Sequence, residues 1–232
     1  MKKAMVFLFI IACILVVIPA NSANALSLDS VFVTNDQHVD VDQLLEEGKS
    51  DGERVDKAIL TNEYGEEYIV DVYAIETSSV GNTKAITYVT STDENLIQVP
   101  NIASRANNNH REKWDSSYSV KAYITCYFVT KDKDKLWLLT KVTGGYTISD
   151  YSVSVTSQAL KYGCSGLTST NGVGTTQVKD QKPQSSKWSY NTGFTKYVVK
   201  NAGLLSATIG ANNKLSLKRG SSKWTFTVTN NL

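Results

Sequence analysis

Hydrophobic and polar residues alternate along much of residues 119–232, as in β-strands with one buried face. In SVKAYITCYFV, alternate residues form an apolar face made of Val120, Ala122, Ile124, Cys126 and Phe128. KWTFTVT near the C-terminus likewise points Trp224, Phe226 and Val228 inward. Similar strand patterns recur within residues 136–155, 187–199 and 204–220, and no comparable helical period follows residue 119. This pattern predicts a β-sandwich over 119–232.

The preceding segment, residues 26–94, predicts a smaller β-rich region with one short helix. The helix is expected over Val41–Glu47, before Gly48. Three strands are expected at Ala58–Leu60, Glu67–Glu76 and Lys84–Thr90, separated by turns. Proline, an asparagine run and a serine pair interrupt any periodicity in residues 95–118, which we interpret as a linker.

The first 25 residues have the pattern of a secretory signal peptide. Lys2 and Lys3 precede an apolar run, and Ala23 and Ala25 form an A-x-A cleavage site, so cleavage is expected after Ala25. The apolar run of about fifteen residues is shorter than the roughly 20 that a membrane-spanning helix requires. Lipidation at Cys13 is a less favoured alternative, because apolar residues follow it where a lipoprotein has a polar tether. We therefore expect a secreted, extracellular protein.

The distribution of charge divides the chain into two halves. Residues 26–118 hold 18 acidic and 7 basic residues, a balance of −11, whereas residues 119–232 hold 4 acidic and 15 basic, a balance of +11. Two interpretations remain open. The basic half binds an anionic surface, or an acidic pro-segment is cleaved near Arg105 or Arg111 and releases a cationic toxin-like or antimicrobial domain.

The two cysteines that follow the signal peptide, Cys126 and Cys164, are expected to form a disulfide, as is usual in exported chains. Cys126, Trp137 and Tyr162-Gly163-Cys164 resemble the Cys–Trp–Cys and tyrosine-corner pattern of immunoglobulin domains. The cysteines are only 38 positions apart, which limits the resemblance to an Ig-like sandwich in general. The expected fold is thus mainly β: a C-terminal Ig-like β-sandwich after a small acidic β-rich region.

Residues with catalytic chemistry are few. His38 and His110 lie in no recognised motif, and no nucleophile, metal-ligand or phosphate-loop signature is present, so we expect no enzyme, cofactor or metal. The predicted anion-binding residues are Lys214, Lys218, Arg219 and Lys223. Tyr123 and Tyr127 share the outer face of one strand and are a candidate glycan platform.

These residues define the expected partners. The expected partner is an anionic cell-surface polymer or a membrane surface. On a bacterial cell envelope, the corresponding ligands would be teichoic acid or lipid headgroups. A protein partner stays open, and no specific nucleic acid is predicted.

Overall fold

The computed structural model describes residues 39–62, 64–92, 97–98, 120–168, 172–200 and 207–231. From Asp40 onward the chain forms one compact unit. The predicted signal peptide and processing positions, with both histidines, lie outside the described residues: Cys13, Ala25, His38, Arg105, His110 and Arg111.

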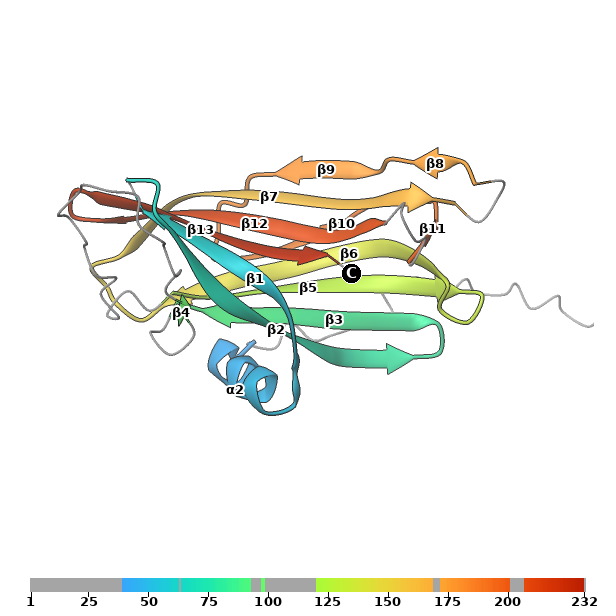
Figure 1. Ribbon diagram of the computed structural model, residues 1–232, viewed down its shortest axis with the longest axis horizontal. Coiled ribbons are helices and arrows are strands. Elements are labelled where there is room, and N and C mark those ends of the chain that lie inside the picture. The colour runs from blue at the N-terminus through green and yellow to red at the C-terminus, as the bar shows by residue number, and fades with distance from the viewer. Residues whose placement is uncertain are drawn as a thin grey trace, which may run out of the picture. The chain divides into compact units, whose positions relative to one another are not determined.

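One helix and thirteen strands make up the described fold (Figure 1). The helix, α2 (Val41–Asp51), extends four residues beyond the predicted end. Along the chain the strands are β1 (Glu53–Asn62), β2 (Glu67–Val80), β3 (Thr83–Ser91), β4 (Ile97–Gln98), β5 (Val120–Lys131), β6 (Leu136–Ile148), β7 (Ser154–Leu167), β8 (Gly174–Thr175), β9 (Val178–Gln181), β10 (Lys187–Asn191), β11 (Val198–Val199), β12 (Thr208–Arg219) and β13 (Ser222–Asn231).

The strands form one large antiparallel sheet in the order β10-β6-β5-β3-β2-β1-β13-β12-β7-β8. Three short strands pair outside this order: β11 with β6, β4 with β2, and β9 with β7. The sheet is strongly curled into a half-barrel, so that β5 and β6 face β12 and β7 across its interior. A contact across this interior joins Cys164 Sγ on β7 to the carbonyl oxygen of Trp137 on β6, 3.7 Å away.

The mainly β prediction with one short helix is confirmed, but the sheet topology differs from a separate sandwich over residues 119–232. Strands β1, β2 and β3 come from the acidic half and lie between β5 and β13, which come from the basic half. Leu60 on β1 is paired in register with Phe226 on β13, and both side chains are fully buried. Alternation indicates which face of a strand is buried, but it does not specify the neighbouring strand, so the sequence pattern missed this arrangement.

The inner face of the curled sheet carries the core. The predicted inward residues of β5 and β13 are buried: Val120, Ala122, Ile124, Cys126, Phe128, Trp224, Phe226 and Val228. Gly144 on β6 leaves room for the indole of Trp188, because a Cβ atom there would lie 2.4 Å from the Trp188 ring and 2.7 Å from the Tyr123 carbonyl oxygen. Interiors packed this closely tolerate little added volume.

Helix α2 covers part of the outer face of the sheet (Figure 1). The side chain of Asp40 caps the helix by accepting hydrogen bonds from the backbone N–H groups of Asp42 and Gln43, at 3.0 and 3.2 Å. Gly48 packs against Tyr73, and Asp42 forms an ion pair with Lys121. The helix contacts β2, β3 and β5, and the outer face of β1, β13, β12 and β7 carries mainly polar, solvent-accessible side chains.

Candidate functional site

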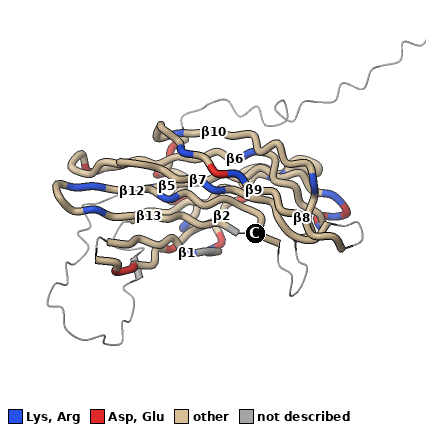
Figure 2. The backbone as a smooth tube through the Cα atoms, turned by 90° about the horizontal axis from the view of Figure 1, so that it is seen from above, with Lys and Arg blue, Asp and Glu red and all other residues tan. Residues whose placement is uncertain are grey.

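Three of the four predicted anion-binding residues lie on one surface of the sheet. Lys214 and Lys218 on β12 alternate with buried Leu215 and Leu217, so their side chains project from the outer face. Lys223 on β13 is the direct cross-strand partner of Lys218. All three lysines are exposed. Figure 2 shows their strands with basic positions near the β12–β13 hairpin.

Arg219, the fourth predicted residue, has a different environment. It follows Lys218 by one position and therefore projects toward the opposite side of β12. Its guanidinium lies 3.6 Å from the carboxylate of Asp150, which follows β6. This ion pair compensates the charge of Arg219, so we exclude it from the group formed by Lys214, Lys218 and Lys223, called here the lysine face.

The charges of the lysine face do not stabilise the sheet. None of its lysines forms an ion pair with another residue of the described chain. Like charges directly opposite each other on neighbouring strands destabilise a sheet, and Lys218 faces Lys223 in this way. Positions that break a local rule without compensation in the fold are candidates for a functional role.

A shallow hollow of about 250 Å³ lies beside this lysine pair. Its lining combines the two cations and several hydroxyl and amide side chains with the apolar Leu217 and Trp224, and it comes from β1, β7, β12 and β13: Thr61, Asn62, Thr156, Ser216, Leu217, Lys218, Lys223, Trp224 and Thr225. Ammonium groups donate hydrogen bonds to anions, and hydroxyl groups both donate and accept. The hollow therefore suits a ligand that is both anionic and polar.

The candidate glycan platform is largely covered. Tyr123 and Tyr127 are only 5 % and 6 % exposed. The Tyr123 ring lies against Gly145, and Lys141 Nζ is 5.5 Å from the centre of the Tyr127 ring. Burial of Tyr123 also raises the pKa of its hydroxyl. Neither ring offers an open face on which a sugar could stack.

The expected disulfide is not formed in the structure: Cys126 and Cys164 are both free and buried. Cys126 Sγ contacts Asn230 on β13, with the amide nitrogen 3.4 Å away. Cys164 lies opposite Trp137, whose partner on β5 is Thr130, four residues beyond Cys126. Four residues of strand span roughly 13 Å, and a disulfide requires Cα atoms within about 7 Å. Strand β7 does cross to face β6, but the two thiols are offset along the strands.

These buried thiols predict a loss of stability at alkaline pH. Burial raises the pKa of Cys126 to about 12, although a hydrogen bond with Asn230 lowers it in part. Between pH 9 and 12 the unfolded chain loses this proton and the folded chain retains it, so the free energy of unfolding falls by about 1.4 kcal/mol per pH unit. Denaturant titrations of the native protein and a Cys126→Ala variant, carried out at several pH values, measure this fall in the free energy of unfolding. The difference in stability between them should shrink above pH 9, and parallel pH profiles would contradict the prediction.

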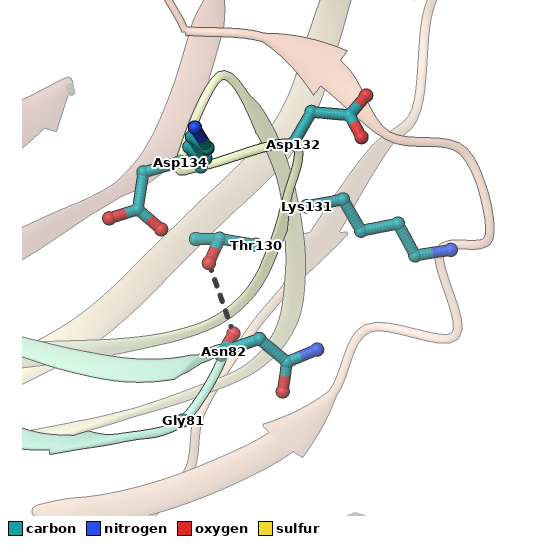
Figure 3. Close-up of a pocket in the computed structure, with 7 residues that line it drawn as sticks. Gly81, Asn82, Thr130, Lys131, Asp132 and Asp134 are labelled. Atoms are coloured by element: carbon teal, nitrogen blue, oxygen red, sulfur yellow. Dashed lines mark hydrogen bonds between the residues drawn. The ribbon is translucent and has the colours of Figure 1, made fainter.

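A second hollow, of about 420 Å³, lies at the opposite end of the sheet, where the sequence pattern indicated no candidate residue (Figure 3). It is lined by Gly81, Asn82 and residues 130–134. The KDKDK turn has three successive residues with positive φ, Asp132, Lys133 and Asp134. Thr130 donates a backbone hydrogen bond of 2.7 Å to the Asn82 carbonyl and joins the two hairpin turns. Alternating charge alone did not indicate this conformation.

The charges around this second hollow are partly compensated. Lys84 Nζ lies 2.7 Å from the carboxylate of Asp134, and hydrogen bonds from Lys84 and Thr130 hold the pKa of Asp134 below its usual value. Lys84 and Lys200 also lie over the Trp137 ring, 5.7 and 4.3 Å from its centre. Because these lysines already have partners, we rank this hollow below the lysine face as an anion site.

Within the described part of the chain, no group of three or more His, Cys, Asp or Glu side chains is placed to hold a metal ion. The described helix is too short and too polar to cross a membrane. Comparisons with protein-family models, curated proteins and solved structures gave no match.

Proposed function

We propose that this is a secreted, non-catalytic protein that binds an anionic polymer or surface of the cell envelope through the lysine face. The observation that carries the proposal is the cross-strand pair Lys218–Lys223, exposed and without ionic partners among the described residues. Lys214 extends the positive charge along the same side of β12. A surface of one charge sign attracts oppositely charged polymers with an affinity that salt weakens.

The curled sheet suits this role as a rigid support. Like an Ig-like β-sandwich, it packs two sets of strands over a shared core and leaves an outer face for binding. Strands β12 and β13 are paired along nearly their whole length, from Gly210 with Asn231 to Arg219 with Ser222. The lysines are thus held on paired strands, which positions them more firmly than a loop would.

The proposal predicts that replacing Lys214, Lys218 and Lys223 by Gln weakens binding to inorganic polyphosphate and flattens its salt dependence. Each lost contact between lysine and phosphate reduces the slope of log K against log salt by roughly 1, so the slope should fall by about 3. Isothermal titration at several salt concentrations gives both quantities. The far-ultraviolet circular dichroism of the variant should be unchanged, because all three side chains are exposed.

A matched control comes from the opposite end of the sheet. Replacing Lys131, Lys133 and Lys135 by Gln changes the net charge equally but leaves the lysine face intact. This control should bind polyphosphate almost as the native protein does. Equal weakening by the two triple variants would show that net charge alone drives binding, and binding insensitive to salt and to both variants would refute the proposed function.

A further inference from the structure

The strand register places four hydroxyl residues in a row across the outer face. Thr61 on β1 pairs with Thr225 on β13, Thr225 with Ser216 on β12, and Ser216 with Ser157 on β7. Thr61, Thr225 and Ser216 each lie between two buried residues of their strands, and Ser157 is exposed and precedes the buried Gln158. Neighbouring strands are roughly 4.8 Å apart, so this hydroxyl row spans roughly 14 Å across four strands.

Cations of the lysine face flank the hydroxyl row on both sides. Lys218 and Lys223 lie two residues from Ser216 and Thr225 toward the hairpin, a distance of roughly 7 Å along the strands. Lys214 lies two residues from Ser216 in the other direction. The row therefore runs between two positions of positive charge.

Hydrogen bonds hold the centre of the row in place. Ser157 Oγ donates to Ser216 Oγ at 2.9 Å, and Thr156 Oγ1 donates to the Ser216 carbonyl at 3.2 Å. The strand pairing shifts between Ser216 and Leu217, and this irregularity brings Thr156 to the hollow beside the lysines. Ser216 keeps its own proton as a donor for a ligand.

An acidic residue marks one end of the row. Glu67 on β2 is exposed and pairs with Thr61, and its carboxylate would repel an anionic ligand that continued past β1. The accessible path thus runs across β1, β13, β12 and β7, perpendicular to the strands.

We propose that the ligand is a polyol-phosphate polymer, an extended phosphodiester chain with free hydroxyl groups, that lies across these four strands. Its phosphates contact Lys214, Lys218 and Lys223, and its hydroxyls exchange hydrogen bonds with the hydroxyl row. Lysine supplies point charges for phosphate, and a hydroxyl satisfies both the donors and the acceptors of a polyol. This inference rests on the proposed function and adds the chemical class of the ligand.

The test compares two soluble polymers, poly(glycerol phosphate), which has free hydroxyls, and inorganic polyphosphate, which has none along its chain. A variant with Ser216→Ala and Thr225→Val removes the two central hydroxyls and keeps every charge. Loss of two hydrogen bonds should weaken binding of poly(glycerol phosphate) about ten-fold. Binding of polyphosphate should weaken much less, because its chain has no hydroxyl groups to exchange hydrogen bonds with the row and is held mainly by the lysines. Thr229→Val, on the same strand and face but outside the row, is the matched control and should bind both polymers normally.

The outcomes separate this inference from the proposed function. Equal affinity of the native protein for the two polymers, or equal weakening of both by the double variant, would overturn the polyol-phosphate assignment and leave the lysine face as a general anion site. Binding only to phosphatidylglycerol vesicles, and to neither soluble polymer, would overturn it in favour of a membrane surface. Failure of the Lys214, Lys218 and Lys223 triple variant to change any binding would overturn the proposed function itself. Cooperative unfolding of each variant confirms that it is folded.

Discussion

Residues 119–232 produced without the N-terminal strands should not form a stable fold. Removing residues 26–118 deletes β1, β2 and β3 from the middle of the sheet. Strand β5 then loses its pairing with β3, from Thr83–Val129 to Ser91–Lys121, and β13 loses its pairing with β1. Two unpaired edges and the exposed apolar faces beside them would remain, a combination that favours aggregation.

Circular dichroism with urea unfolding checks this expectation on the purified fragment. A chain of residues 26–232 should unfold in one cooperative transition, whereas the fragment should be aggregated or show no transition. A second measurement uses this longer chain after cleavage between residues 95 and 118. Its two pieces should elute together in size-exclusion chromatography because β1, β2 and β3 of one piece lie between β5 and β13 of the other. A fragment that unfolds cooperatively, or pieces that separate without denaturant, would contradict the prediction.

Instability of the 119–232 fragment would argue against the interpretation of the acidic half as a pro-segment. A pro-segment that covers a finished domain can leave after cleavage, but strands inside a shared sheet cannot leave without unpairing their neighbours. The large charge asymmetry then has another physical meaning. The acidic β1–β3 region and the basic β12–β13 region belong to one sheet, and their opposite charges give one molecule two electrostatically different regions. We expect the anion to be attracted to the basic one.

The fold could be predicted from the sequence at the level of its elements, since side-chain alternation has a direct physical cause. Trp224, Phe226 and Val228 were expected to face inward and are buried, and the helix begins at Val41 as expected. The order of the strands was not predictable in the same way. Pairing of Leu60 with Phe226 joins residues that are far apart in the chain, and no local pattern encodes which apolar strand meets which.

For the candidate site, the sequence likewise predicted individual residues but not which residues of other strands lie beside them. The sequence placed Lys218 and Lys223 in one predicted anion-binding group, and the register places them opposite each other. The ion pair of Arg219 with Asp150 could not be predicted, because Asp150 comes from another strand connection. The hydroxyl row was invisible in the sequence, because Thr61, Thr225, Ser216 and Ser157 become neighbours only through the pairing of four strands. A single strand rich in threonine gives no indication of it.

Replacing Phe226 by Ala should be the most destabilising single substitution proposed for the core. Phe226 is fully buried at the centre of β13 and pairs with Leu60 on one side and Leu215 on the other. Truncation of a buried phenylalanine removes its contacts and leaves a cavity, at a cost of about 3–5 kcal/mol. Thr227→Ala, one position away on the outer face, should change stability by less than about 1 kcal/mol.

Combining Phe226→Ala with Leu60→Ala tests whether the two halves of the chain share one core. Residues in contact show coupling energies of about 0.5–3 kcal/mol, whereas changes at distant sites add independently. Because Leu60 belongs to the acidic half and Phe226 to the basic half, we expect the double variant to lose less stability than the sum of the single losses. Urea unfolding of the four proteins measures the coupling. Strict additivity, or two separate unfolding transitions in the native protein, would show that β1 and β13 do not form the common core on which the lysine face and the hydroxyl row depend.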